Sequence, residues 1–300
     1  MKSKNNILIV GGTGFIGYHL AKKSLQKGWK VTSISTKKPK RIRFLPKVEY
    51  IFCDISNIRS LKKKTQKYFK YVVNLGGYVD HSNKKKTYES HFLGCKNLAD
   101  IFLIKKPKAF IQMGSSVEYG NLKSPQKENG KCKPVSVYGK SKFLATKYLI
   151  DLYNNKKFPC TVLRLYLAYG PKQDLNRFLP IIINGCKKNK KFPCSRGTQF
   201  RDFVHVKDVV DVIIKSLSNK NARGQIMNIG SGKPKKLRNI IKYVQEFSNG
   251  GYPQFGKIKL RKDEIFKIYA SIKKAKKLVN WKPRISFEKG IKNTIKSYDK

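Results

Sequence analysis

The sequence predicts an α/β fold built on a doubly wound, mostly parallel sheet. Three observations predict it. Apolar runs of strand length alternate with segments of helical length and period through the first half of the chain. A glycine cluster directly follows the first of these runs. The 300 residues, of which 40% are hydrophobic, suffice for one large α/β domain with a real core.

The expected elements follow one another in the order that βαβ units require. The first strand, Ile7–Val10, precedes a helix over Phe15–Lys27 whose apolar residues recur at helical spacing. Two further helices are expected over Ile58–Tyr68 and His91–Ile104. The remaining strands are expected at Val31–Ile34, Val48–Phe52, Val72–Leu75, Ala109–Met113 and Thr161–Leu165. Together they predict a sheet of six or more strands.

After about residue 170 the segments become shorter, and proline and glycine interrupt them more often. This change predicts a smaller C-terminal lobe. We expect residues 1–169 to form the dinucleotide-binding domain, with 201–224 returning to it, and 170–200 and 225–300 to form the substrate lobe. Ligands of such sheets bind beyond the carboxyl ends of the strands, so this lobe would close a cleft over them.

The formal net charge of +50 suggests nucleic acid as a partner, because Lys and Arg neutralise phosphates. The basic residues, however, are 56 Lys and only 11 Arg, spread along the whole chain. Arg is the residue whose fixed fork reads phosphates and base edges. The composition therefore favours a solvated Lys-rich surface over nucleic-acid binding.

The six Cys form no C-x-x-C pair and have no His at a spacing typical of metal sites, so the sequence predicts free thiols, no metal site and a cytoplasmic protein. The N-terminal apolar run spans only four residues before the glycines, which is too short for a signal peptide. No stretch approaches the length of a membrane span.

The glycine cluster between the first strand and the first helix reads GGTGFIG, residues 11–17. Glycines here let the chain turn tightly and bring backbone N–H groups to a pyrophosphate at the helix N-terminus. Because the cluster lies in a complete βαβ context, it favours a Rossmann-type dinucleotide site over a structural turn. The predicted cofactor-binding residues of this cluster are Gly11, Thr13, Gly14, Phe15, Ile16 and Gly17.

The end of the second strand determines which nicotinamide cofactor is expected. An acid that holds the ribose 2′-hydroxyl belongs there, but Ser35 takes its place, followed by Thr36, Lys37 and Lys38. A hydroxyl-rich, positively charged turn accepts a 2′-phosphate, so NADP(H) is preferred over NAD(H), which stays possible. The basic residues that follow and are expected at the surface are Lys40, Arg41 and Arg43.

Further cofactor contacts are expected where the third and fourth strands end. Asp54 follows the third strand and is a candidate to hydrogen-bond the adenine. The other residues predicted there are Ile55, Leu75, Gly76 and Gly77.

Tyr138 and Lys142 lie four residues apart in an expected helix, so both side chains point from one face. A nearby ammonium favours the phenolate and lowers the Tyr pKa, which makes the phenol a usable acid or base. Ser115, just after the strand Ala109–Met113, supplies a hydroxyl that could complete a proton relay. These three residues are the catalytic candidates.

Eight motifs occur in order along the chain: GGTGFIG (11–17), CDI (53–55), GSSVEYG (114–120), YGKSK (138–142), LRLYLAYGP (163–171), RDFVHVKDV (201–209), NIGSG (228–232) and LVNWKPRISFEKGI (278–291). In this order they resemble the extended short-chain dehydrogenase/reductases that modify nucleotide sugars. The resemblance implies that Tyr138 exchanges a proton with the sugar, Lys142 holds the nicotinamide ribose and Ser115 orients the reacting oxygen. The substrate-binding residues it suggests are Ser116, Asn176, Arg201 and Arg261, the two Arg gripping the diphosphate.

Departures from the family's motifs narrow the implied reaction. In the 4,6-dehydratase branch an Asp-Glu pair follows the catalytic Ser/Thr, whereas Ser116 and Val117 stand here. Leu167 replaces an Asn that is frequent in epimerases and dehydratases, and His91, where many members have Asn, is expected to be structural. The segment 255–264 is similar to deoxysugar 4-ketoreductases of the CDP-abequose synthase and dTDP-fucose synthase type.

The resemblance thus implies NADPH-dependent reduction of a nucleotide-linked 4-keto-6-deoxyhexose for surface polysaccharide assembly, with Tyr138 as proton donor. A nucleotide-sugar 4-epimerase with retained NAD is the alternative and would use the same residues. A non-catalytic RNA-binding or regulatory protein is a further alternative, prompted by the charge of +50; the intact catalytic set argues against it. Related enzymes often dimerise through helices, so a homodimer is expected.

Overall fold

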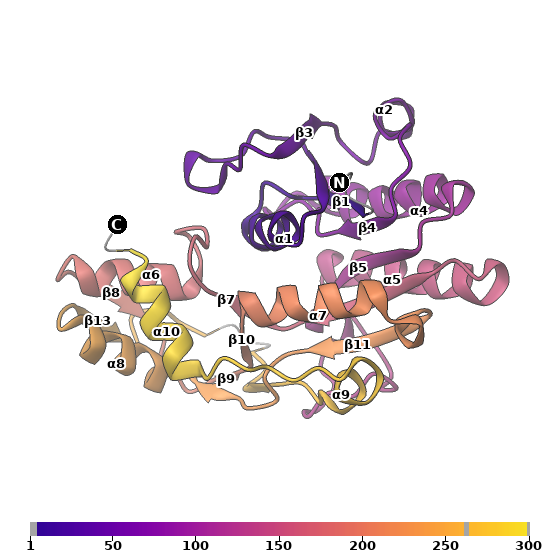
Figure 1. Ribbon diagram of the computed structural model, residues 1–300. Helices are drawn as coiled ribbons and strands as arrows, with labels where there is room; N and C mark the ends of the chain where they lie inside the picture. The colour runs from indigo at the N-terminus through magenta and orange to yellow at the C-terminus, as the bar shows by residue number, and fades with distance from the viewer. Residues whose placement is uncertain (1–4, 261–263, 299–300) are drawn as a thin grey trace.

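The computed structural model describes residues 5–260 and 264–298. Its centre is a sheet of seven strands in the order β11-β6-β5-β4-β1-β2-β3, and every neighbouring pair is parallel (Figure 1). The strands are β1 Asn6–Val10, β2 Lys30–Ser35, β3 Val48–Phe52, β4 Tyr71–Asn74, β5 Ala109–Ser115, β6 Cys160–Leu165 and β11 Gln225–Ile229. The predicted α/β fold with a doubly wound parallel sheet is confirmed.

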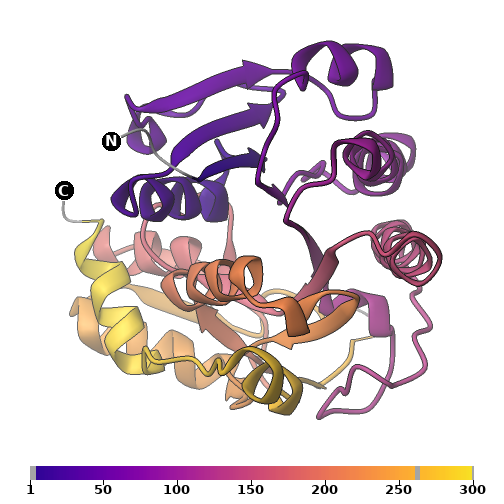
Figure 2. The same ribbon diagram turned by 45° about the vertical axis from the view of Figure 1, so that its right-hand side comes forward.

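Helices cover both faces of this sheet (Figure 2). One layer contains α1 (Phe15–Gln26) and α7 (Val206–Ser218), which contact each other. The other contains α2 (Ile58–Lys64), α4 (Gly94–Lys105) and α5 (Val137–Lys156). Short helical turns complete the domain: η1 Arg41–Arg43, α3 Lys84–Tyr88, the π-helical η2 Glu89–Leu93, η3 Ser116–Tyr119 and η4 Lys220–Ala222.

The strand β1 shows why its sequence is an uninterrupted apolar run. Ile7 and Ile9 belong to the core under α1 and α7, while Leu8 and Val10 belong to the core under α2, α4 and α5. All four side chains are at most 2% exposed. Because successive residues of a strand point to opposite faces, a strand covered on both faces must be apolar at every position.

The smaller lobe has a core of its own, formed by α6 (Phe178–Lys187), α8 (Leu237–Ser248) and α10 (Phe287–Lys296). These helices lie together at the lower left of Figure 1. The lobe's remaining strands are β7 Leu167–Tyr169 with β10 Phe203–His205, β8 Lys191–Cys194 with β13 Tyr252–Phe255, and β9 Phe200–Arg201 between β12 Lys235–Lys236 and β14 Lys267–Ile268. The helix α9 (Lys273–Val279) packs on the core of the central domain instead.

The domain boundary expected at residue 225 needs correction. The sequence predicts 225–300 in the substrate lobe, yet β11 is the last strand of the central sheet and pairs with β6. The reason is burial: Met227 and Ile229 are fully buried in the same core as Ala275 and Val279 of α9. The central domain therefore recruits segments from both halves of the chain.

Two helices also differ from expectation. The helix expected at 58–68 ends at Lys64, where the hydroxyl of Thr65 donates to the Leu61 carbonyl at 2.7 Å. The helix expected from His91 begins at Lys84, because the Asn83 side chain caps it by accepting the Lys86 N–H at 2.9 Å.

The loop after β2 is anchored to the segment that follows β7. Arg43 is only 3% exposed and donates to the Lys172 carbonyl from Nε and Nη2, at 2.9 and 2.7 Å. Asp174 pairs with both Arg43 and Lys40, at 3.0 and 2.9 Å. The expected surface position is therefore wrong for Arg43, whose partners lie too far along the chain to be read from the sequence.

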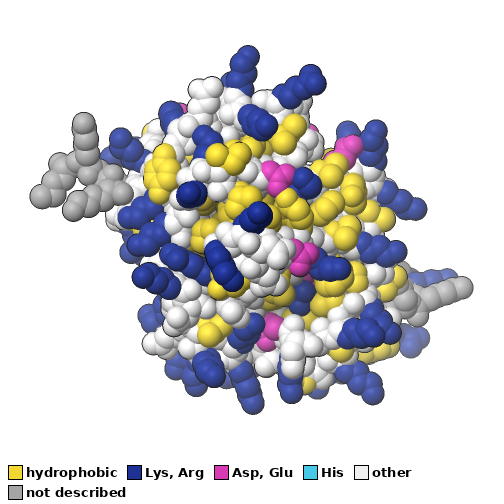
Figure 3. Space-filling model, turned by 90° about the vertical axis from the view of Figure 1, so that its right-hand side faces the viewer, with side chains coloured by type: hydrophobic (Ala, Val, Ile, Leu, Met, Phe, Trp, Pro, Cys, Tyr) yellow, Lys and Arg dark blue, Asp and Glu magenta, His cyan; other side chains and the backbone are white. Residues whose placement is uncertain are grey.

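Basic side chains cover the surface without gathering in one patch on the face seen in Figure 3. Within residues 5–260 and 264–298, no helix has the length and apolar character needed to cross a membrane. All six Cys are free.

Candidate active site

The glycine loop between β1 and α1 is shaped by two close approaches. Gly11 adopts φ +78°, which side chains rarely allow, and a Cβ on Gly17 would lie 2.2 Å from the Gly11 carbonyl oxygen. The helix α1 starts at Gly14 with no capping side chain and no acid in its first turn. An uncapped helix N-terminus reached by bare backbone suits a pyrophosphate, so these residues can hold a dinucleotide.

We expect Gly17→Ala to weaken cofactor binding and to lower the free energy of unfolding by about 1–3 kcal/mol, the usual range for overpacking. The added methyl group meets backbone atoms of Gly11 and Gly12, which cannot move aside cheaply. Calorimetric titration with NADPH or NADH and denaturant unfolding measure the two effects. Gly28→Asn is the control, since a Cβ at Gly28 meets nothing within 4 Å and Asn tolerates a positive φ. Wild-type affinity in Gly17→Ala would contradict the expectation.

The end of β2 lies against this loop. The Ser35 hydroxyl accepts the Thr13 N–H at 3.4 Å and donates to the Ile34 carbonyl at 2.8 Å. Thr36, Lys37 and Lys38 follow and are exposed. Of the residues expected to choose the cofactor, Ser35 thus contacts the glycine loop.

The ends of β3 and β4 border the same loop. The Asp54 carboxylate accepts the N–H and hydroxyl of Ser56 at 2.9 and 2.8 Å, so it closes its own turn and remains exposed. Leu75 donates its N–H to the Val10 carbonyl at 2.9 Å. A Cβ on Gly11 would come within 3.0 Å of the Gly76 nitrogen. Leu75 and Gly76 therefore pack directly on the loop, and buried Ile55 lies next to Gly76, whereas Gly77 lies against the His91 ring.

The three catalytic candidates come together. Ser115 ends β5, while Tyr138 and Lys142 lie in the first turns of α5. Ser115 lies close enough to Tyr138 to lower the pKa of its phenol. The Lys142 Nζ donates to the Met113 carbonyl at 2.7 Å and lies 6.0 Å from the centroid of the Tyr138 ring. The end of β5 and the start of α5 thus bring together the three side chains of the predicted relay.

The electrostatics of this relay differ from the expectation. Burial raises the pKa of Tyr138, and the nearby Ser115 side chain offsets only part of that rise, whereas the sequence predicts a depressed pKa. Burial likewise lowers the pKa of Lys142 to about 8. Both shifts have one cause, because removing a charged form from water costs free energy. Tyr138 consequently holds its proton at neutral pH.

Two His flank Tyr138, and sequence reasoning missed one of them. The His81 ring stacks on the Tyr138 ring with centroids 4.0 Å apart and planes 13° apart. His91 meets the same ring edge-on at 4.8 Å and bonds the Tyr78 carbonyl at 3.1 Å. Burial lowers the pKa of His91 to about 2, so it stays neutral and supports the ring. The position of His81 could not be predicted, because the sequence around it has neither helical nor strand periodicity.

The residues suggested for the substrate are less tightly grouped. Arg201, on β9, forms an ion pair with Glu264, and Ser116 opens η3 behind Ser115. Asn176 lies in an exposed turn before α6; the neighbouring Arg177, which sequence reasoning missed, is close enough to lower the pKa of Tyr138. Arg261 lies outside the described residues.

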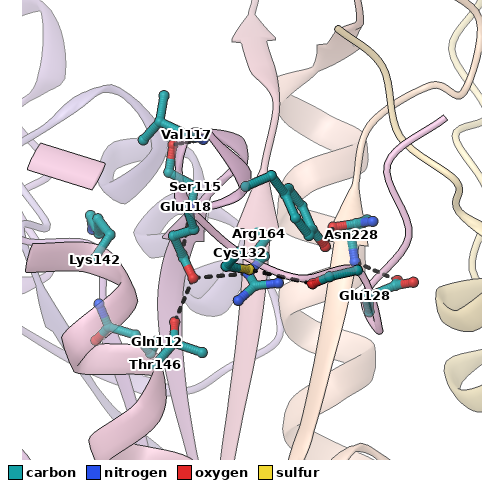
Figure 4. A network of polar contacts seen from close by, with 12 residues as sticks. Gln112, Ser115, Val117, Glu118, Glu128, Cys132, Lys142, Thr146, Arg164 and Asn228 are labelled. Atoms are coloured by element: carbon teal, nitrogen blue, oxygen red, sulfur yellow. Dashed lines mark hydrogen bonds and ion pairs between the residues drawn. The ribbon is translucent and has the colours of Figure 1, made fainter. Parts of the chain in front are cut away.

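Behind Ser115 lies a buried network that the sequence did not suggest (Figure 4). Its centre is Glu118, fully buried and paired with Arg164 of β6 at 2.8 Å. A buried acid leaves no local pattern, because its partner lies 46 positions away.

Much of the chain matches a known protein family. Residues 7–230 match the model of the NAD dependent epimerase/dehydratase family. A putative UDP-glucose 4-epimerase of Methanocaldococcus jannaschii is 31% identical over 306 aligned residues, covering 96% of this chain and 97% of the relative. A CDP-abequose synthase of Salmonella muenchen is 24% identical, with 96% of each chain covered.

Among solved structures, the fold is similar to that of a UDP-glucuronic acid 4-epimerase from Bacillus cereus in complex with UDP-glucuronic acid and NAD. The TM-score is 0.86 at 22% identity, with 98% of this chain and 99% of that chain covered.

Proposed function

This chain belongs to the NAD dependent epimerase/dehydratase family, and from that premise we propose that it reduces the C4 keto group of a nucleotide-linked 4-keto-6-deoxyhexose. The observation that carries the proposal is the grouping of three side chains: Ser115 lies close enough to Tyr138 to lower its pKa, and the Lys142 Nζ lies 6.0 Å from the centroid of the Tyr138 ring. A phenol that keeps its proton at neutral pH is in the form that a reduction requires.

A bound nicotinamide supplies hydride in this reaction. Tyr138 donates its phenolic proton to the sugar oxygen, and Ser115 hydrogen-bonds that oxygen and orients it. Lys142, buried beside the ring, provides a positive charge that favours the phenolate left after proton transfer. We propose that Arg201 and Arg261 bind the substrate diphosphate. In the structure, the carboxylate of Glu264 occupies the guanidinium of Arg201 in an ion pair.

Water elimination is a poorer fit to these residues. It needs an acid and a base beside the catalytic serine, but the next two residues are Ser116 and Val117. The nearest acid along the chain, Glu118, is fully buried, and its oxygens accept from Ser115, Thr146 and Arg164. It therefore cannot reach a sugar.

A nucleotide-sugar 4-epimerase is the second candidate, favoured by the likeness to the Methanocaldococcus protein. It would use the same relay but return hydride to the opposite face of the sugar. The two reactions differ in whether cofactor is consumed.

The test is a panel of 4-keto and 4-hydroxy sugar nucleotides, each assayed with NADH and NADPH. The reductase consumes NADPH only when a 4-keto sugar nucleotide is present. Interconversion of UDP-glucose and UDP-galactose without added cofactor, on protein that retains NAD through purification, would overturn the reductase in favour of the epimerase. The proposal includes a homodimer, which sedimentation equilibrium tests.

We propose NADP(H) as the cofactor and expect Lys37→Asp with Lys38→Asp to raise the KM for NADPH about 10- to 100-fold, since a charged hydrogen bond contributes about 1.5–3 kcal/mol. The KM for NADH should change little, because its ribose carries no 2′-phosphate. Steady-state kinetics with both cofactors measure the effect. Lys62→Asp with Lys63→Asp, on exposed positions of α2, is the charge-matched control. Equal losses with both cofactors would exclude a 2′-phosphate site.

A further inference from the structure

The carboxylate of Glu118 joins the two elements that carry the catalytic candidates (Figure 4). Its Oε1 accepts the backbone N–H of Ser115 at 2.8 Å. Its Oε2 accepts the Thr146 hydroxyl and the Arg164 Nε, each at 2.8 Å. One side chain thus connects the end of β5, the helix α5 and the strand β6.

Thr146 connects this carboxylate to Tyr138 and Lys142. It lies one helical turn after Lys142 and two turns after Tyr138, so the three residues share a face of α5. Lys142 itself is bonded to the Met113 carbonyl, two residues before Ser115. The helix is therefore attached to β5 at two points, immediately behind the relay.

The close approach of the carboxylate to β5 has a requirement of its own. A Cβ on Gly114 would lie 2.6 Å from the Glu118 Oε1, so only glycine leaves space for the acid at this place. Arg164, 2% exposed, stacks on Tyr119 with 4.5 Å between its guanidinium carbon and the ring centroid, and Tyr119 bonds Asn228 of β11 at 2.7 Å. Contacts from both the sheet and the helix thus hold the acid.

We propose that Glu118 is a positioning residue, which holds the Ser115 hydroxyl beside Tyr138 by anchoring the Ser115 N–H to α5 and β6. Glu118 does not touch the substrate, because it is fully buried and three donors occupy its oxygens. Buried ion pairs contribute little net stability compared with apolar replacements, whereas misplacing a catalytic group by about 1 Å costs about 100-fold in rate. Only the expected changes in kcat rest on the proposed function.

Two double variants separate the anchor from the ion pair. Both remove Arg164 through Arg164→Met; one adds Glu118→Gln, which keeps an oxygen for the Ser115 N–H, and the other adds Glu118→Leu, which does not. We expect Glu118→Gln/Arg164→Met to keep kcat within about threefold and Glu118→Leu/Arg164→Met to lose about 10- to 100-fold. The KM values and the dissociation constant of NADPH should stay close to wild type in both. Equal kcat in the two folded variants would overturn the proposal.

Amide hydrogen exchange gives a readout that needs no turnover. A peptide containing Ser115 should exchange slowly in the wild type and in Glu118→Gln/Arg164→Met, and faster in Glu118→Leu/Arg164→Met. Identical exchange in all three would overturn the anchor, whether or not the protein turns over. Absence of turnover in the wild type with the whole sugar-nucleotide panel would instead overturn the proposed function.

A single substitution keeps the test open if either double variant fails to fold. Thr146→Val removes only the attachment to α5, and Thr146→Ser retains it, so kcat should fall about tenfold in the first and stay near wild type in the second. Thr294→Val is the matched control: it is also a buried helical Thr, but its hydroxyl donates to the Gly290 carbonyl of α10 at 2.7 Å. If Thr146→Val lowers the melting temperature as much as Thr294→Val does but leaves kcat unchanged, the proposal is contradicted.

Discussion

Tyr138→Phe should lower kcat by about 100- to 10,000-fold, the range that general acid catalysis contributes. The substitution removes the only phenolic proton at the relay while keeping the ring. Since the ring packs against His81 and His91 through its face and edge, we expect the melting temperature and the affinity for NADPH to stay close to wild type. A fall in kcat without a fall in binding would identify Tyr138 as the proton donor. Steady-state kinetics and calorimetric titration provide the two measurements.

Tyr148→Phe is the matched control for this experiment. Tyr148 lies on the same helix, but its hydroxyl bonds Asp100 of α4 and so faces away from the relay. We expect its kcat to match the wild type. If Tyr138→Phe keeps half of the wild-type kcat or more, the proton comes from another group, and the proposed reaction loses its principal support.

Arg164→Met should lower the free energy of unfolding by about 3–5 kcal/mol, because it leaves a buried carboxylate without its cation. Glu118 is fully buried and Arg164 is 2% exposed, so water cannot replace the lost partner. Adding Glu118→Gln should restore most of the loss, since the double variant no longer buries a charge. Urea unfolding of the two single variants and the double variant measures the coupling.

Lys235→Met serves as the comparison for a surface ion pair. Lys235 and Glu288 are 3.0 Å apart, with side chains 40% and 52% exposed. Such a pair contributes about 0–1 kcal/mol. If Arg164→Met lowers the free energy of unfolding no more than Lys235→Met does, the expectation is contradicted. The protein would then tolerate the buried carboxylate of Glu118 without its cation.

Much of the sheet could be predicted from the sequence because its signals are local. Ile7–Val10 is apolar at every position, as a strand with helices on both sides must be. The glycines that follow it predict the turn into the first helix. The spacing of Tyr138 and Lys142 predicts a shared helical face, and the rule that parallel strands end at one edge brings Ser115 toward them.

The missing parts depend on contacts between distant residues. Nothing near Glu118 in the sequence shows that its charge would meet Arg164 inside the core, and nothing near Arg43 shows that it would bind the carbonyl of Lys172. The expected depression of the Tyr138 pKa failed for the same reason, since it considered one neighbouring charge and not the burial of the whole site. Segment QIMNI (225–229) has strand length, but only its partner β6 assigns it to the central sheet.

The late return of β11 to the sheet also bears on how the chain folds and what becomes of shortened forms. Until Gln225–Ile229 has been synthesised, β6 is an uncovered edge whose backbone groups can pair with any extended segment. Its residues Cys160–Arg164 are buried in the finished protein, so the open edge would also expose the apolar side chains of Val162 and Leu163. We therefore expect a chain that stops before residue 225 to self-associate, rather than survive as a minimal nucleotide-binding unit.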